Sequence, residues 1–413
     1  MHKSLSNARS ITVLATGLTM AHIMGGCAAR HRTFGDDVEF LREHTGSTLV
    51  LGHDPSGPRV AVVGEYQGRV MTSSATGDEG RSYGWINYDL IASGELRPHM
   101  NAFGGEERLW LGPEGGQFAL FFAPGTEFAF EDWQTPAPID SEPFELVGSG
   151  PTSASYSRNA SIENYSGAAF DLRIDRDVVL LDERQIGEAL GAPIAGLSAV
   201  GYETRNRVTN TGPAAWTKER GLVSIWLLGM FKPGQRTTVV IPFREGDEAR
   251  LGRVVNDEYF GKVPAERLKV GDGVLFFRGD SQHRGKIGLS PRRATPLAGS
   301  WDPDMGVLTI VQFSFPGPEV ADYVNSMWRV QEDPYGGDVI NSYNDGPTTP
   351  GGKALGGFYE IETSSPALAL KPGQSGVHTS RTIHLEGDRA ALDAVARRTL
   401  GVGLGEIEAA FAE

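Results

Sequence analysis

Short segments in which apolar and polar residues alternate recur along most of the 413-residue chain, and Gly or Pro separates most of them. A period of two is typical of strands with one buried face. In residues 200–210, for example, Tyr202, Thr204, Asn206 and Val208 share one face. The pattern predicts roughly fifteen or more strands, among them residues 48–51, 59–63, 69–72, 117–122, 144–147, 154–162, 168–181, 200–210, 221–231, 237–242, 273–278, 307–315, 337–343, 357–363 and 376–385.

Helical spacing is confined to a few segments. Residues 34–44 and 182–190 predict short helices, and residues 388–400 predict a C-terminal helix that Asp388 caps. No repeat and no low-complexity linker divides the chain. We therefore expect an all-β fold, a large sandwich of antiparallel sheets with a few short helices, formed by residues 35–413 as a single domain.

The first 26 residues are typical of an export signal. Lys3 and Arg9 precede an apolar stretch, residues 11–24, that is too short to span a bilayer comfortably. Met24-Gly25-Gly26-Cys27 follows and is similar to a bacterial lipoprotein cleavage box. Cys27 is the one cysteine of the chain, so it forms no intramolecular disulfide. We predict a signal peptide over 1–26, lipidation of Cys27, a tether over 27–34 and anchoring to a bacterial membrane. The alternative is an ordinary signal peptide with an incidental cysteine.

A net charge of −14 argues against nucleic acid as a partner. Without a second cysteine or any nucleotide-binding glycine motif, the sequence gives no reason to expect a thiol nucleophile or a cofactor. We expect a monomer.

Residues 100–120, MNAFGGEERLWLGPEGGQFAL, combine carboxylates, an amide, a guanidinium and an indole around glycine turns. Such a set suits a sugar, because hydroxyls need paired polar partners and the apolar ring face needs an aromatic surface. The alternative is a hairpin with a core tryptophan and a surface ion pair. The candidate substrate-binding residues here are Asn101, Glu106, Arg108, Trp110 and Glu114.

Two later segments carry further polar candidates. In the strand FYEIETSS, Glu360 and Glu362 project on one face, where mutual repulsion favours a raised pKa for one of them; the alternative is an exposed strand face. Residues 331–346 contain Glu332, Asp333, Asp338, Asn341, Asn344 and Asp345, oxygen donors that suit Ca²⁺ or, for Asp338 and Asn344, a sugar; the alternative is a pair of turns. His99 and His283 are candidate general acids, and Lys286 is a candidate partner of an acidic sugar.

The segments NAFGGEERLWLGPEGG, GGDVINSYNDG and GGFYEIETSSPALALKPGQSGVH together resemble the galactose-mutarotase-like, or aldose-1-epimerase-like, superfamily. The resemblance implies a β-supersandwich that binds carbohydrate in a cleft. It also implies that Glu362, in Ile361-Glu362-Thr363-Ser364, is the general base, and that Arg108 holds the sugar ring. The expected histidine acid is missing from residues 206–230, which contain Trp216 and Trp226 instead.

The sequence thus predicts an exported carbohydrate-binding lipoprotein that acts at the anomeric carbon by carboxylate chemistry. Two alternatives remain open. One is a glycan-binding protein without activity, and the other is a glycoside hydrolase or lyase of the same fold.

Overall fold

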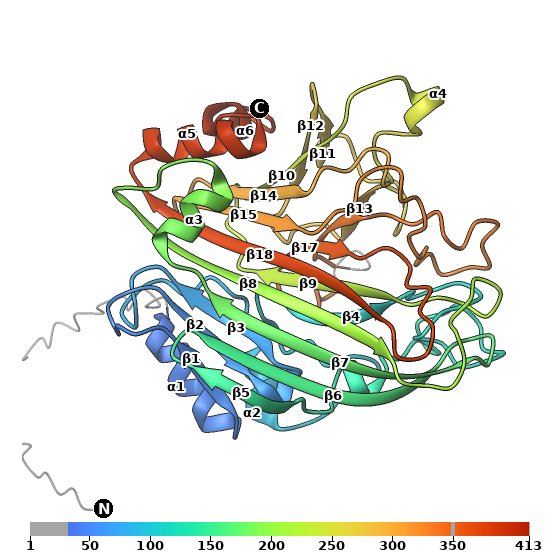
Figure 1. Ribbon diagram of the computed structural model, residues 1–413. Coiled ribbons are helices and arrows are strands. Elements are labelled where there is room, and N and C mark those ends of the chain that lie inside the picture. The colour runs from blue at the N-terminus through green and yellow to red at the C-terminus, as the bar shows by residue number, and fades with distance from the viewer. Residues whose placement is uncertain (1–31, 348–351, 413) are drawn as a thin grey trace, which may run out of the picture. The chain divides into compact units, whose positions relative to one another are not determined.

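The computed structural model describes residues 32–347 and 352–412, and residues 32–412 belong to one compact unit. It contains three antiparallel sheets (Figure 1). The predicted all-β antiparallel fold is therefore confirmed. The predicted signal peptide and Cys27 lie outside the described residues.

The largest sheet has ten strands in the order β11-β12-β10-β14-β15-β18-β8-β7-β6-β5. Its long central strands cross the view of Figure 1 diagonally. Along β7 buried and exposed residues alternate, so one face packs inward and the other meets solvent. The strands are β5 (Glu145–Gly150), β6 (Ser153–Glu163), β7 (Ala169–Leu180), β8 (Leu197–Asn210), β10 (Thr238–Pro242), β11 (Leu268–Val270), β12 (Val274–Arg278), β14 (Leu297–Asp302), β15 (Val307–Phe313) and β18 (Ser375–Gly387).

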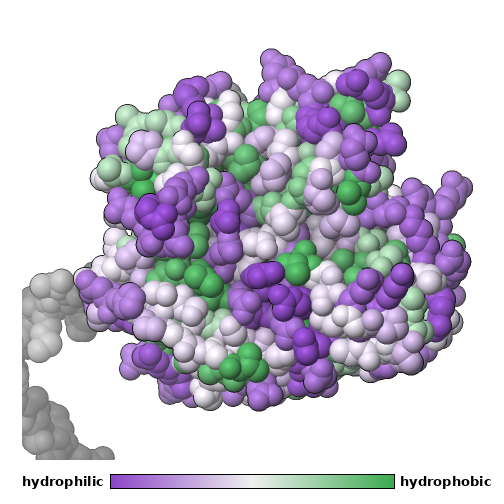
Figure 2. Space-filling model, viewed as in Figure 1, coloured by the Kyte–Doolittle hydropathy of each residue, from purple (hydrophilic) through white to green (hydrophobic). Residues whose placement is uncertain are grey.

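The molecular face in Figure 2 mixes hydrophilic and hydrophobic residues, as expected where alternating strands meet solvent. Small helices pack against the sheets. The helices are α1 (Phe34–His44), α2 (Tyr88–Ser93), α3 (Glu183–Leu190), α4 (Glu248–Leu251), α5 (Arg389–Leu400) and α6 (Leu404–Ala409), with 3-10 turns at Gly64–Tyr66 and Ala137–Ile139. The three helices predicted from the sequence are present as α1, α3 and α5.

A five-stranded sheet in the order β13-β16-β17-β9-β4 forms the second layer, and a three-stranded sheet, β1-β2-β3, adjoins α1. Every strand pair in both sheets is antiparallel. The strands are β1 (Thr48–Leu51), β2 (Arg59–Val63), β3 (Arg69–Ser74), β4 (Arg108–Gly112), β9 (Ser224–Phe231), β13 (Gly285–Leu289), β16 (Ile340–Asn344) and β17 (Tyr359–Ser364).

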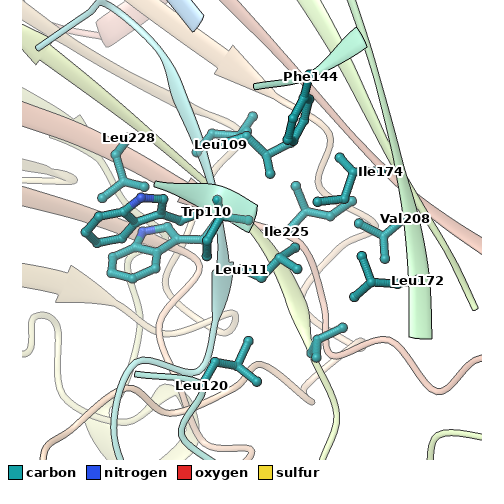
Figure 3. Packing of buried hydrophobic residues seen from close by; sticks show 14 of the residues in the cluster. Leu109, Trp110, Leu111, Leu120, Phe144, Leu172, Ile174, Val208, Ile225 and Leu228 are labelled. Carbon is teal, nitrogen blue, oxygen red and sulfur yellow. The ribbon is translucent and has the colours of Figure 1, made fainter. Parts of the chain in front are cut away.

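The main core lies between the two larger sheets. Leu109 and Ile225 of the five-stranded sheet pack with Leu172, Ile174 and Val208 of the ten-stranded sheet (Figure 3). Trp110 and Leu228 lie on the other side of β4 in the same view. The five-stranded sheet is therefore covered on both faces, and its second face carries the polar residues described next.

One predicted strand is wrong. Residues 117–122 form turns and an isolated bridge instead of a strand. Their apolar side chains are buried against the rings of this region, with the Phe121 ring 6.0 Å from Trp133 and stacked on it. Packing of bulky apolar residues in an irregular loop produces the same sequence pattern as a buried strand.

Candidate functional site

Side chains from β4, β9 and β17 meet on the face of the five-stranded sheet that points away from the ten-stranded sheet. Arg108 of β4 and Glu362 of β17 both pair with Leu228 of the strand between them. Residues directly opposite in a sheet share a face. The glycine-glutamate segment and the late Glu-Ile-Glu strand are therefore brought to one surface, although about 250 residues separate them along the chain.

Two ion pairs occupy this face. Arg108 Nη2 lies 3.0 Å from Glu360 Oε1, and Lys286 Nζ lies 2.8 Å from Glu362 Oε2, with every side chain at most 9% exposed. Trp226 Nε1 also donates to Glu362 Oε2, at 2.9 Å. A buried charge without a partner is strongly unfavourable, so these contacts fix the carboxylates in place.

Several buried polar atoms on the same face have no partner in the structure. They are Glu362 Oε1, Trp110 Nε1, Arg108 Nε and Ser224 Oγ. Most buried polar atoms in proteins are hydrogen-bonded, so such a group of unpaired atoms indicates a site for water or a ligand. A small cavity lies beside them, and its lining includes Gly112, Ser224, Trp226, Tyr259, Lys286 and Asp338.

A hydrogen-bonded group centred on Tyr259 also lines the cavity. Its hydroxyl donates to Asp338 Oδ2 at 2.7 Å, and Asn341 Nδ2 donates to that hydroxyl at 3.2 Å. Burial raises the pKa of Asp338 and places the pKa of Tyr259 well above its ordinary value. The Lys286 ammonium lies 4.8 Å from the ring centroid of Trp226 and 5.4 Å from that of Tyr259.

Glu114 lies two residues after the end of β4. It is half-buried, and its amide donates to the Oγ of Ser326, a residue that also lines the cavity. Burial raises the pKa of Glu114, against the opposing charge of Lys286 and a hydrogen bond from Trp328. The Trp328 ring stacks on Trp133 at 5.8 Å. The cavity beside the polar face is small, whereas the resemblance implied a cleft that binds carbohydrate.

Glu360 occupies the opposite end of the polar face from the cavity. Burial raises its pKa to about 7, although Arg108 acts against the shift. Its strand neighbours Met230 and Tyr343 belong to an apolar cluster with Ala102 and Phe358. This apolar surrounding is the desolvating environment that raises the pKa of Glu360.

Two predicted binding residues lie away from the polar face. Asn101 donates to Asp140 Oδ2 at 2.7 Å and fixes a loop. Glu106 is completely buried, where its carboxylate accepts from Ser73 and lies 3.1 Å from His384 Nε2. Both side chains are satisfied by the protein, which accounts for their burial.

Three further candidates also lie outside the polar face, and two of their side chains have structural partners. Asn344 accepts from the amide of Ser281 at 2.9 Å and donates to the carbonyl of His283 at 2.9 Å, so it holds the connection between β12 and β13. The His283 side chain is exposed on that connection. His99 Nδ1 lies 2.6 Å from the carbonyl oxygen of Trp133, and its ring lies 4.6 Å from that of Phe130.

Sequence reasoning missed several residues of the site. Trp226 lies in the most apolar strand, where its indole looked like core. Tyr259 lies in a loop without a recognisable motif. Asn341 was considered only as a calcium ligand. The one usable signal was period-two spacing on β9, which places Ser224 and Trp226 on one face.

The residues considered for Ca²⁺ do not converge. Asp345 accepts from the amides of Gly356 and Gly357 at 2.9 Å, whereas Asp338 faces Tyr259. Within residues 32–347 and 352–412, no three His, Cys, Asp or Glu side chains gather in a way that would hold a metal ion. Calcium binding stays an untested prediction. No helix of the same residues combines the length and the apolar character needed to cross a membrane.

Fold and site together define an antiparallel β-sandwich protein with a buried charged site on the five-stranded sheet. The chain belongs to a family of unknown function, DUF6786, whose model matches residues 32–411. No curated protein matches the sequence.

Several solved structures are similar to this chain. The Slr1438 protein from Synechocystis is 13% identical with a TM-score of 0.50, over 83% of this chain and 96% of that one, which shows a shared fold. A putative aldose 1-epimerase from Escherichia coli is 14% identical with a TM-score of 0.47, over 83% and 99% of the two chains. A galactose mutarotase-like protein from Lactobacillus casei is 10% identical with a TM-score of 0.46, over 82% and 100%. Proteins described as aldose 1-epimerase or galactose mutarotase-like are therefore among the solved structures similar to this chain.

Proposed function

We propose that the protein binds carbohydrate at the polar face of the five-stranded sheet and acts at the anomeric carbon by carboxylate acid/base chemistry. The observation that carries the proposal is the set of unpartnered buried atoms, Glu362 Oε1, Trp110 Nε1 and Ser224 Oγ, next to the cavity. Sugar hydroxyls both donate and accept, so one ligand satisfies a carboxylate and an indole N–H together. The adjacent indole rings suit the apolar face of a sugar.

Glu362 is the proposed base. Lys286 and Trp226 hold its Oε2, which leaves Oε1 free to accept the proton of an anomeric hydroxyl. Arg108 lies 3.9 Å from the ring centroid of Trp110 and pairs with Glu360, so it orients both groups. The similarity of residues 361–364 to the epimerase base strand supports the same role for Glu362.

A second candidate is a glycan-binding protein without activity. It is favoured by the two closed ion pairs, because each carboxylate already has a cationic partner. In that case the polar face serves recognition alone, and Glu362 accepts a hydroxyl hydrogen bond without taking the proton.

A panel of aldoses and oligosaccharides distinguishes these functions. Polarimetry on fresh α-glucose and α-galactose should show faster approach to equilibrium, and Glu362→Gln should remove the acceleration. Glu127→Gln, an exposed carboxylate of a neighbouring loop, should not. Calorimetric binding with no product would favour recognition alone, and new reducing ends would indicate hydrolysis. Neither binding nor turnover of any sugar would refute the proposal.

We also propose that the chain is exported and lipid-anchored through Cys27, because the N-terminal sequence is similar to a lipoprotein signal. We propose in addition that the protein is a monomer. Cells that express the full chain should incorporate labelled palmitate into it, and Cys27→Ser should abolish incorporation. Label retained in the variant would contradict the anchor. Sedimentation of the purified protein should give the mass of one chain.

A further inference from the structure

The cavity beside the polar face has the size of a single polar group. Its volume is about 20 Å³, and about 10–15 Å³ is enough for one water molecule. Gly112 keeps this space open, because a Cβ atom there would lie 2.8 Å from Ser224 Oγ and 3.0 Å from the Val324 side chain. Ser224 is 1% exposed, and its hydroxyl has no partner among the described residues. The cavity therefore offers an unsatisfied hydrogen-bonding group to a hydroxyl or an ammonium of a ligand.

Asp338 brings to this cavity a carboxylate that is bonded only by neutral groups. Its two hydrogen bonds, from the Tyr259 hydroxyl at 2.7 Å and from Asn256 Nδ2 at 3.0 Å, both end on Oδ2. Tyr259 stays neutral, because burial raises its pKa well above the ordinary value. Burial also raises the pKa of Asp338, the direction expected for a carboxylate that loses solvent and gains no bonded cation.

The neighbouring cations do not balance the charge of Asp338. Lys286 lines the same cavity, but its ammonium lies 2.8 Å from Glu362 Oε2 and is paired with that carboxylate. Arg253 also acts on Asp338, yet its side chain is exposed and faces Glu258 at 3.7 Å. One negative charge is therefore left over at the cavity, and Lys286 is not available to an acidic ligand.

We propose that the cavity selects an amino sugar, whose unacylated amine binds as an ammonium between Asp338 and Ser224; the inference rests on the proposed carbohydrate binding at this face. An ammonium donates three hydrogen bonds and supplies the missing positive charge, whereas a hydroxyl has one donor and no charge. An acetylated amine is neutral and larger than the single group that the cavity holds. A uronic acid adds a second negative charge beside Asp338.

Calorimetric titration of the full chain tests this selectivity with glucose, galactose and their 2-amino, N-acetylamino and uronic acid forms. At pH 6.5 one of the two amino sugars should bind about 10-fold more tightly than its parent sugar, because hydrogen bonds to charged groups are the stronger ones. The N-acetylamino and uronic acid forms should bind no more tightly than the parent. At pH 9, where the free amine is largely neutral, the preference should fall below about threefold.

Three variants locate the selectivity. Asp338→Asn keeps the shape of the side chain and removes its charge, so the affinities for the amino sugar and the parent sugar should become about equal. Ser224→Ala, which leaves Asp338 in place, should lower the preference about threefold. Asp272→Asn changes an exposed aspartate of the turn between β11 and β12 and should keep the full preference.

Each outcome has one meaning. A wild type that binds neutral and amino sugars equally, or prefers a uronic acid, overturns the selectivity and leaves the proposed function standing. A preference that survives in Asp338→Asn overturns the role of Asp338. Should that variant fail to fold, a preference unchanged in Ser224→Ala and at pH 9 overturns the inference instead. A wild type that binds none of these sugars overturns the proposed function and this inference together.

Discussion

Replacement of Glu360 by glutamine tests the electrostatics of the polar face. Burial raises the pKa of Glu360 from an ordinary 4.5 to about 7. A group with a higher pKa in the folded state contributes stability that is complete below pH 4.5 and is lost as the pH rises through 7. The difference corresponds to about 3 kcal/mol in the free energy of unfolding, most of which is lost between pH 5 and pH 8.

Urea unfolding of the wild type and of Glu360→Gln at pH 5 and pH 8 measures this loss. At pH 5 Glu360 keeps its proton, so glutamine, which is also neutral, should change the free energy of unfolding little. The glutamine does not titrate, so the free energy of unfolding of the wild type minus that of the variant should fall by about 2–3 kcal/mol on going from pH 5 to pH 8. Glu127→Gln, at an exposed position, should show a gap near zero at both. A difference, wild type minus variant, that stays constant or rises with pH would refute the raised pKa.

Further substitutions test single contacts, each by urea unfolding at pH 7. Lys286→Met should cost about 3–5 kcal/mol because it leaves the buried Glu362 carboxylate without a cation; the exposed Lys371→Met serves as control, and equal effects of the two would count against the buried pair. Trp226→Phe should cost about 1.5–3 kcal/mol through loss of a hydrogen bond to a charged group. An unchanged free energy of unfolding would show that this hydrogen bond does not stabilise the protein. Asp388→Ala should cost about 1 kcal/mol because it removes the N-cap of α5, and an unchanged midpoint would show that the cap contributes little.

Much of the secondary structure followed from local pattern alone. The bounds of α1, β1 and β2 agree with the sequence prediction, and Glu360 and Glu362 share a face as their spacing requires. Periodicity is a property of residues that are close in the sequence, so it predicts helices and strands without knowledge of the rest of the fold. Residues 117–122 show its limit, because a loop buried under large rings carries the same apolar pattern.

The site could be predicted only in part. Arg108, Lys286 and Glu362 were identified by residue type, but their contacts depend on which strands adjoin β9 and in what register. Glu106 shows the opposite case, since it stands two positions before Arg108 yet is buried against His384. By residue type, Glu106 and Arg108 are equally good candidates for a binding site. Only their surroundings in the folded protein separate them.

The sequence by itself determined the all-β class, the alternation that exposes one face of strands such as β7, and the polar residues available for chemistry. The tertiary structure decided which of these residues meet, because strand order and register act across about 250 residues of chain. It also decided the pKa of Glu360, because a pKa depends on burial and on neighbouring charges that no local stretch of sequence contains.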